Sequence, residues 1–299
     1  MNQGEINIFE IISIINRKKL IIFSITSIFV ILSLIYAFSI PNKYSSHALL
    51  APSDDSSSSE MLGQLGGFAN LAGLSLDESG DKTDEAIERI KSFEFFKEYI
   101  LNESVLVDLM AAKGWNSSDK KVIYDSNKYD LKSGKWVRKS FIPFTSIPNK
   151  PSTQEAYKYF KKMLFVSQNS STGFTELSVT HFSPHVAQRW CENIIININK
   201  SMRDEERLRV QNSIDFLNEQ YKNSNYKELK VAASSLVEEQ MKSLMFVEAS
   251  ESFVFKVIDS PIVSEFKSSP KRLTILIVGL IFGLLTSTTV ILFNHYRQN

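Results

Sequence analysis

The sequence predicts an α+β membrane protein with a two-helix transmembrane hairpin, an α/β base domain and a long extended helical arm. Two uncharged apolar runs near the chain ends, residues 20–40 and 273–293, predict the hairpin. After Pro184, more than sixty residues up to Phe246 contain neither Gly nor Pro, which predicts the arm. Shorter helix and strand signals between these features predict the base.

Each apolar run is long enough to cross a bilayer as a helix. At about 1.5 Å per residue, either run covers roughly 30 Å of hydrocarbon. A cleaved signal peptide is the alternative for the first run. However, its apolar part exceeds the about 7–15 residues of such peptides, and no clean A-x-A site follows it. Buried core helices rarely supply two such runs, so we expect both to be membrane anchors.

Basic residues beside the first run predict its orientation. Arg17, Lys18 and Lys19 precede it and favour the cytoplasmic side. Lys271 and Arg272 flank the second run on the opposite side, which is a mild conflict. The first helix usually dominates, and long loops translocate regardless of their charge. We therefore expect short cytoplasmic tails and the whole chain between the runs outside the cytoplasmic membrane.

The second apolar run contains two glycines at a spacing that suits helix packing. Gly279 and Gly283 are four residues apart, and Thr286 and Ser287 follow one turn later. Small residues at this spacing let two helix backbones approach closely. Glycine is also simply common in transmembrane helices. We expect the two glycines to contact either the first span or a neighbouring subunit.

Composition excludes some classes of function without naming one. The net charge is +1, with 34 basic and 33 acidic residues, so the chain has no basic footprint for nucleic acid. Cys191 is the single cysteine, so no internal disulfide framework is available. Stability must come from burial or from association with other copies.

Two helix signals follow the first polar loop of the base domain. Asp84 can cap a helix from Glu85 to Leu101. A second helix, from Ser104 to Ala112, is expected to end with Gly114 in the position after the helix. The chain beyond it is polar and rich in turns up to residue 150, with Trp136 as the expected packing anchor.

The clearest local signal in the base domain follows Pro151. Ser152 and Glu155 form a capping box at the start of a helix. Its apolar stripe comprises Ala156, Tyr159, Phe160 and Met163. Three strands are predicted elsewhere, at residues 44–50, in GFTELSVTHF (173–182) and in SFVFKVIDSP (252–261).

The arm carries one apolar stripe with steps of three and four residues. It contains Ala187, Cys191, Ile194, Ile198, Met202, Val210, Ile214, Leu217 and Tyr221. Six charges in RDEERLR (203–209) require a solvated helix, held by intrahelical pairs and a neighbour along one narrow edge. KNSNY (222–226) predicts a turn; the alternative is one continuous rod. The return helix is expected to bury Leu229, Ala233, Leu236 and Leu244.

No catalytic, cofactor or metal site is predicted. His181 and His185 lack an acidic or Cys partner at ligand spacing. The helical stripe around Cys191 predicts a packed thiol rather than a nucleophile. The glycines at 63, 66, 67 and 73 match neither the G-x-x-x-x-G-K-[ST] nor the G-x-G-x-x-G phosphate-binding motif. Close packing is expected there instead. H-E-x-x-H and G-x-S-x-G motifs are absent from the sequence.

Four stretches of the sequence resemble one protein family in content and order. They are INIFEIISIINRKKLII, PNKYSSHALL, the block KPSTQEAYKYFKKMLFVSQNSSTGFTELSVTHFSPHVAQRWCENIIININK, and LVEEQMKSLMFVEASESFVFKVIDSPIVSEFKSSPKR. The chain resembles the polysaccharide co-polymerases, the chain-length determinant proteins of bacterial O-antigen and related surface glycans. The matching membrane-proximal positions are Pro41, Tyr44, Pro261 and Pro270.

The resemblance implies a non-enzymatic protein of the bacterial inner membrane with its bulk in the periplasm. It implies ring-shaped homo-oligomers that set the modal length of a glycan made by a separate membrane polymerase. A lipid-linked glycan and membrane lipids are further candidate partners. Some relatives append a cytoplasmic tyrosine kinase, whereas only NHYRQN follows the second span here, so we expect no kinase activity. A periplasmic ligand-binding or envelope-sensing membrane protein is the alternative.

These inferences divide the chain into seven expected parts. The expected order is a cytoplasmic tail (1–19), a first span (20–40), a periplasmic α/β base (41–183), the arm (184–250, turn near 222–226), a closing strand and Pro-rich segment (251–272), a second span (273–293) and a cytoplasmic tail (294–299).

Overall fold

The structure is a computed structural model of the chain that describes residues 17–53, 78–138 and 148–298. It contains two compact units. The membrane unit comprises residues 1–43 and 266–299, and the extramembrane unit comprises residues 44–265. The chain contains both helices and strands, with one apolar helix towards each end, and this confirms the predicted fold class. The glycines at 63, 66, 67 and 73 lie outside the described residues.

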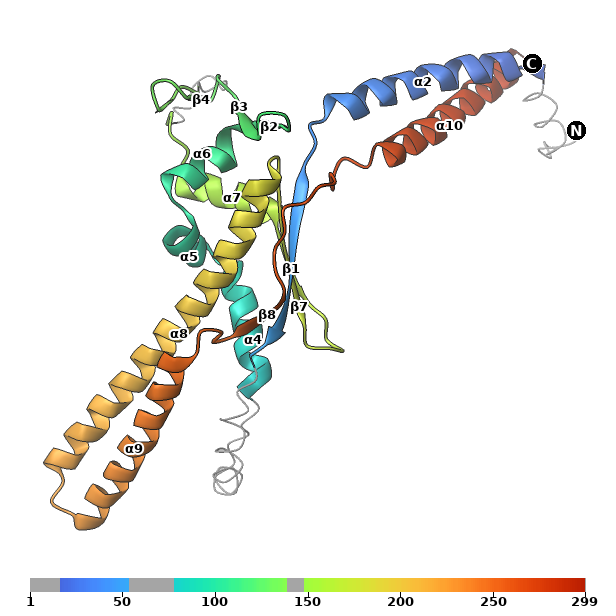
Figure 1. Cartoon of the computed structure of the whole chain (residues 1–299). Coiled ribbons are helices and arrows are strands. Elements are labelled where there is room, and N and C mark those ends of the chain that lie inside the picture. Colours follow the sequence, from blue (N-terminus) through green and yellow to red (C-terminus); the bar gives the residue numbers. More distant parts are fainter. Residues whose placement is uncertain (1–16, 54–77, 139–147, 299) are drawn as a thin grey trace, which may run out of the picture. The chain divides into compact units, whose positions relative to one another are not determined.

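Two antiparallel apolar helices form the membrane unit (Figure 1). These are α2 (Lys19–Ser39) and α10 (Arg272–Gln298), and both are long and apolar enough to cross a membrane. Arg272 joins them at one end, because its Nε donates to Ala37 O (3.3 Å) and its Nη2 donates to Asn42 Oδ1 (3.0 Å). Arg272, one of the two basic residues that conflict with the predicted orientation, therefore has a structural role.

A four-stranded antiparallel sheet lies in the extramembrane unit. Its order is β6 (Leu164–Gln168), β7 (Thr175–His181), β1 (Tyr44–Pro52) and β8 (Phe255–Asp259). The chain thus places its first strand between a later hairpin and its last strand. Sequence signals predicted the other three strands but not β6, whose exposed Phe165 and half-buried Leu164 give no clean alternation.

The main core lies between this sheet and α8 (Pro184–Asn223). Leu50 and Leu177 are fully buried on the sheet, and Trp190, Ile194 and Ile198 are buried on the helix. Ile194 and Ile198 belong to the stripe that the sequence predicted for α8, and Trp190 lies beside it without having been predicted. Burial of these side chains contributes about 1.5–3 kcal/mol each.

Asn199 joins α8 to the edge strand β8 from within this core. Its Oδ1 accepts hydrogen bonds from Val254 N (2.8 Å) and Phe255 N (2.9 Å). Its Nδ2 donates to Phe255 O (3.0 Å) and to Ile195 O (3.2 Å). A buried amide with all of these partners positions the closing strand at the base of the arm.

Four helices and a π-turn complete the extramembrane base. They are α4 (Glu78–Ile90), α5 (Phe93–Phe95), the π-turn η1 (Phe96–Ile100), α6 (Glu103–Ala111) and α7 (Thr153–Met163). The single helix predicted up to Leu101 is wrong. Ser92 interrupts it, because its side chain accepts a hydrogen bond from Phe95 N (3.2 Å) and caps a new helix.

The polar region after α6 contains short strands that the sequence analysis missed. They are β2 (Ala112–Asn116), β3 (Lys121–Tyr124), β4 (Tyr129–Asp130) and β5 (Lys135–Trp136). Gly114 lies within β2, so its predicted place just after a helix is wrong. The α6 helix stops at Ala111 instead, because the chain becomes extended at Ala112.

The α7 helix begins as its sequence predicts. Ser152 Oγ accepts a hydrogen bond from Glu155 N (3.2 Å), which is the cap expected there. Its buried stripe differs from the prediction, because Tyr159 is 43% exposed. Tyr157 packs inward instead, with its ring 5.7 Å from that of Phe96.

Helix α8 and helix α9 (Lys227–Ala249) form the arm as an antiparallel hairpin (Figure 1). The predicted return stripe is wrong in two places, because Leu229 and Leu236 are exposed. We define the seam as the α9 residues with steps of four and three that are buried or half-buried. They are Ala233, Val237, Gln240, Leu244 and Val247.

Candidate binding groove and arm surface

The two glycines predicted for membrane-helix packing face α2. A Cβ atom added to Gly279 would overlap Ser33 Oγ, and one added to Gly283 would lie 3.0 Å from Thr26 Cα. Rotation of the serine side chain would move Oγ but not Ser33 Cβ, which would lie 2.5 Å away. Gly279 is therefore the tighter of the two positions, and Gly283 directly meets the Thr26 backbone. This geometry supports the predicted packing role, which we treat as a proposal and test by substitution below.

The four membrane-proximal positions fall into different units. Pro41 and Pro270 lie in the membrane unit, both on the helix side of the antiparallel backbone pairing between Lys43 and Ser269. Tyr44 begins β1, and Pro261 follows β8, both in the extramembrane unit. Pro41 and Pro270 thus lie where the chain leaves α2 and enters α10. A functional role for these four residues stays a prediction.

Apolar side chains lie exposed on both flanks of the arm seam. Met241 and Met245 each follow a seam residue by one position, whereas Leu236 and Phe246 each precede one. Because each residue turns a helix by about 100°, these two pairs lie on opposite flanks. We define the arm surface as the large exposed apolar residues of the hairpin from Leu208 onward. They are Leu208, Phe216, Tyr221, Tyr226, Leu229, Val231, Leu236, Met241, Met245 and Phe246.

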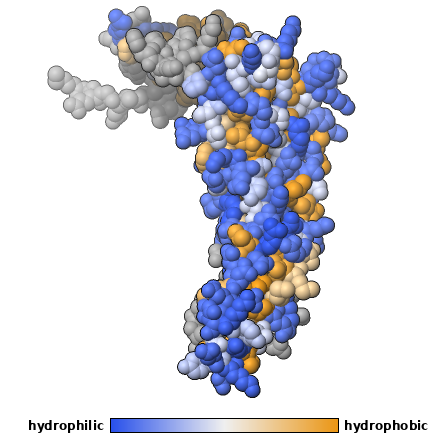
Figure 2. Space-filling view, turned by 90° about the vertical axis from the view of Figure 1, so that its left-hand side faces the viewer, coloured by the Kyte–Doolittle hydropathy of each residue, from blue (hydrophilic) through white to orange (hydrophobic). Residues whose placement is uncertain are grey.

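The residues of this arm surface are strongly exposed. Met245 is 70% exposed and Val231 is 60% exposed. Figure 2 shows apolar patches interrupting the polar surface down one side of the molecule. Contiguous apolar patches on a soluble surface usually mark an interaction site. The arm is therefore a candidate contact surface.

The charged segment at 203–209 lies beside this surface and is solvated, as predicted. Arg209 pairs with Glu206 (2.6 Å), and Arg207 lies 3.7 Å from both Asp204 and Glu248. Exposed pairs of this kind contribute about 0–1 kcal/mol each. The arm is consequently held together by its seam more than by its charges.

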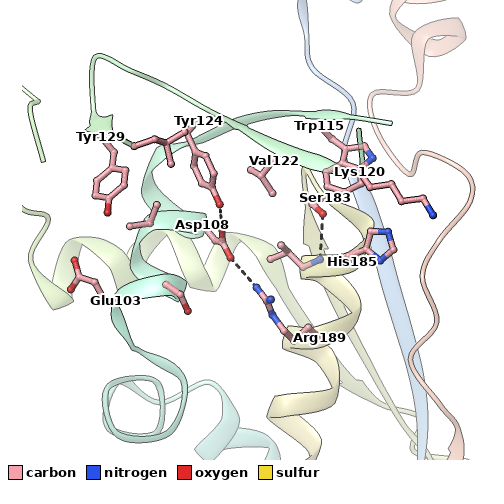
Figure 3. A pocket seen from close by; sticks show the side chains of 14 residues that line it. Glu103, Asp108, Trp115, Lys120, Val122, Tyr124, Tyr129, Ser183, His185 and Arg189 are labelled. Atoms are coloured by element: carbon pink, nitrogen blue, oxygen red, sulfur yellow. Dashed lines mark hydrogen bonds and ion pairs between the residues drawn. The ribbon is translucent and has the colours of Figure 1, made fainter. Parts of the chain in front are cut away.

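A groove of about 710 Å³ lies between α6, the β2–β3 hairpin, β4 and the start of α8. Figure 3 shows Trp115, Lys120 and His185 at one end of it and Tyr129 at the other. Asp108 lies between the two ends. Its volume falls within the about 300–1,000 Å³ of small-ligand sites. The groove is thus the candidate binding site of the extramembrane unit.

Asp108 holds the centre of the groove together. Tyr124 Oη donates to Asp108 Oδ1 (2.5 Å), and Arg189 Nη2 donates to Asp108 Oδ2 (3.0 Å). The aspartate side chain is only 7% exposed, so both bonds are largely shielded from water. Burial, and then the bond to Asp108, raise the pKa of Tyr124, which keeps the phenol a neutral donor.

His181 fixes the backbone of Asp108 through a hydrogen bond to its carbonyl oxygen. Its Nε2 lies 3.0 Å from Asp108 O, and its Nδ1 accepts a hydrogen bond from Ser183 N (3.0 Å). Since Nδ1 is an acceptor, Nε2 carries the proton and donates to the carbonyl. Burial lowers the pKa of His181, so the neutral ring is the stable form.

The turn of the β2–β3 hairpin positions Lys120 over the groove. Asn116 Oδ1 accepts from Ser118 N (3.0 Å), and Asn116 Nδ2 donates to Asp119 Oδ2 (2.7 Å). Lys120 then takes a φ of +49°, in the left-handed region. The hydrogen bonds of the Asn116 side chain hold the turn in one conformation, including the unusual backbone of Lys120, so the turn is preorganised.

The charge of the second carboxylate of the groove, Glu103, is also compensated by a cation. Glu103 accepts hydrogen bonds from Lys150 Nζ (2.6 Å) and from Trp136 Nε1 (3.4 Å). The hydrogen bond from Lys150 lowers the pKa of Glu103. Trp136 also packs against Tyr129, with ring centroids 5.0 Å apart, so it is the packing anchor that the sequence predicted.

The residues weighed for chemistry do not form a catalytic cluster. His181 is buried, whereas His185 is exposed and packs beside Trp115. Burial raises the pKa of the Cys191 thiol to about 12, which makes it a poor nucleophile. In the described parts of the chain, no three His, Cys, Asp or Glu residues lie close enough to hold a metal ion.

A family model matches the beginning of the chain. The model described as Wzz, chain length determinant protein, matches residues 4–109. Residues 4–109 of the chain are thus similar to the chain length determinant proteins. The resemblance inferred from the quoted sequence stretches is therefore confirmed. No curated protein matches the chain at the threshold applied.

Solved structures of co-polymerases are distantly similar to the chain. One, titled full-length bacterial polysaccharide co-polymerase, has 13% identity and a TM-score of 0.40, with 98% of this chain and 99% of that chain covered. Another is a fragment of WzzB, a polysaccharide co-polymerase from Salmonella Typhimurium. It has 13% identity and a TM-score of 0.32, with 76% of this chain and 100% of that chain covered.

Proposed function

We propose that this chain is a non-enzymatic regulator of the chain length of a bacterial surface polysaccharide, O-antigen or a related glycan. The relation to chain length determinant proteins over residues 4–109 supports this role. The chain has two candidate spans and a large extramembrane unit, an architecture that suits a scaffold. The groove offers binding chemistry without an arranged nucleophile or acid–base pair.

The proposed location is the bacterial inner membrane, with the extramembrane unit in the periplasm. The basic residues Arg17, Lys18 and Lys19 before α2 support cytoplasmic ends. Arg272 does not oppose this orientation strongly, because it is engaged with Ala37, Asn42 and the ring of Phe38. Membrane lipids are then direct partners of α2 and α10.

The observation that carries the proposed mechanism is the arm surface. A hairpin with exposed apolar residues on both flanks of its seam suits a ring, in which each copy contacts two neighbours. Burial of these side chains between copies would stabilise the assembly by about 25 cal/mol for each Å² removed from water. We propose that the ring acts beside a separate membrane polymerase and restrains its lipid-linked glycan.

A deletion strain tests the proposed role. Loss of this gene should broaden or shift the length distribution of the surface glycan, read as banding on a gel. Re-expression of the unaltered chain should restore the distribution. Unchanged banding in the deletion strain would remove the regulator role and favour an envelope-sensing protein instead.

Arm variants test the proposed assembly. Met241→Glu with Met245→Glu adds two carboxylates to one flank of the seam, and we expect smaller particles by light scattering in detergent and a lost modal length. The matched control is Ser234→Glu with Ser235→Glu, which adds the same charge at exposed polar positions of α9. An intact oligomer and normal banding with the methionine variant would contradict a ring held by the arms.

A further inference from the structure

We propose that the groove around Asp108 binds an acidic saccharide, a sugar unit that carries a carboxylate. The inference rests on the proposed function for the ligand being a glycan, and it adds the site and the chemical class. Four observations carry it: an aromatic platform, two cations with free donors, neutralised carboxylates and a rigid frame.

The aromatic platform consists of Trp115 and His185. Their ring centroids are 5.5 Å apart and their planes are tilted by 52°, so the platform is two inclined ring faces rather than one plane, and both residues line the groove. An aromatic face carries partial negative charge, and the C–H groups of a sugar ring carry partial positive charge. A sugar ring can therefore pack on this platform, whereas its hydroxyl groups remain free for hydrogen bonds.

Two cations leave hydrogen-bond donors free in the groove. Arg189 uses Nη2 for Asp108, its side chain is 56% exposed, and a guanidinium has five N–H donors. Lys120 lines the groove and has no hydrogen-bond or ion-pair partner within the described residues. A ligand carboxylate at either side chain would receive charge-assisted hydrogen bonds.

The acidic side chains of the groove do not repel such a ligand. Asp108 is compensated by Arg189 and Tyr124, and Glu103 by Lys150. Once these pairs are formed, the ammonium of Lys120 is the uncompensated charge of the lining. The groove therefore favours an anion over a cation, and its aromatic end favours a sugar over an inorganic ion.

The frame of the groove is rigid before any ligand arrives. The Asn116 lock holds the turn that carries Lys120, and Asp108 is fixed at its carboxylate and at its backbone carbonyl. A preorganised site loses little conformational entropy on binding. Free donors in a rigid frame are the arrangement that a specific ligand requires.

Titration calorimetry on the full chain in detergent tests the proposal. The probes are tetragalacturonic acid and maltotetraose, an acidic and a neutral tetrasaccharide of equal length. We expect saturable binding of the acidic probe, weaker binding of the neutral one, and loss of the difference as salt rises, since exposed ion pairs are screened. An absence of saturable tetragalacturonate binding, or equal binding of both probes, would overturn the proposal.

The matched pair Lys120→Asn and Lys121→Asn separates the groove from the hairpin around it. Asparagine tolerates the left-handed backbone at 120, so that variant should fold. We expect about tenfold weaker tetragalacturonate binding for Lys120→Asn, the loss of one charge-assisted bond, and no change for Lys121→Asn. Equal losses in both variants, or none in either, would place the binding elsewhere.

Two further measurements define the ligand class and separate this inference from the proposed function. Polyglutamate that bound as tightly as the sugar acid, with the same dependence on Lys120, would assign the groove to acidic peptides and refute the saccharide. Glycan banding in the deletion strain is scored independently. Binding with unchanged banding would refute the regulator role alone, whereas altered banding without binding would refute the groove alone.

Discussion

At the scale of single residues, His181 couples the groove to the core through its protonation state. Both ring nitrogens are committed, one as acceptor from Ser183 N and the other as donor to Asp108 O. A second proton would remove the acceptor and place a charge in a fully buried position. The fold therefore requires the neutral imidazole.

The neutral imidazole predicts a pH dependence of stability. Burial lowers the pKa of His181 in the folded state, so as pH falls the unfolded chain binds the proton first. Its contribution should be fully present above about pH 6.5 and be lost as pH falls below that value. Urea unfolding followed by tryptophan fluorescence in detergent should show a slope approaching about 1.4 kcal/mol per pH unit from this group.

Glutamine substitutions identify the residue responsible for that slope. His181→Gln retains a side-chain N–H donor and should flatten the dependence of stability on pH below about pH 6.5, at some cost in stability at neutral pH. The control is His47→Gln, because His47 is exposed, at 59% of its side chain. A slope that persisted in His181→Gln and vanished in His47→Gln would contradict the assignment.

The groove shows what sequence reasoning could not reach at this scale. Asp108 meets Tyr124 and Arg189, which are 16 and 81 positions away along the chain. Helical periodicity places Asp108 within a largely buried helix, and a buried acid must have partners, but no local pattern names them. His181 was noted only as a histidine without a metal partner, because its partners are backbone groups.

At the scale of elements, the contact between α2 and α10 depends on a glycine. At Gly283 a Cβ atom would lie 3.0 Å from Thr26 Cα and 3.1 Å from Phe29 Cβ. Gly283→Leu must therefore separate the two helices, at a cost of about 1–3 kcal/mol for overpacking. We expect a lower midpoint of thermal unfolding by circular dichroism in detergent.

Ile281→Leu is the control for this substitution. Ile281 lies on the same helix and is 48% exposed, so Ile281→Leu places the same leucine side chain at an exposed position without adding volume. Gly283→Leu that melted at the same temperature as Ile281→Leu and the unaltered chain would show that this contact does not stabilise the protein.

The arm shows how far periodicity predicts an element. The α8 stripe was predicted well up to Ile214, because its apolar residues form one line in an otherwise polar helix, but Tyr221 at its end is 44% exposed, so that member of the stripe is wrong. The α9 helix carries apolar residues on several sides, so its sequence admits more than one stripe. Leu229 and Leu236 looked equally suited to the interior, but the seam contains Gln240 and leaves these leucines exposed. An apolar pattern does not distinguish an internal contact from a contact with another molecule.

At the scale of the whole molecule, the proposed role depends on which side of the membrane the extramembrane unit occupies. The native Cys191 is fully buried, and burial raises its pKa to about 12, so background labelling by maleimides should be low. Asn225, between α8 and α9, and Arg297, near the end of α10, are both exposed and can each be replaced by Cys.

These two positions should label from opposite sides. In spheroplasts, a membrane-impermeant maleimide should modify Asn225→Cys at once and Arg297→Cys only after the membrane is permeabilised. The reason is that, in the proposed orientation, Arg17, Lys18 and Lys19 keep the N-terminal end of α2 in the cytoplasm, and an antiparallel α10 then returns there. The unaltered chain measures the background from Cys191. Labelling of Arg297→Cys in intact spheroplasts, with Asn225→Cys protected, would invert the topology and place both arm and groove out of reach of a periplasmic glycan.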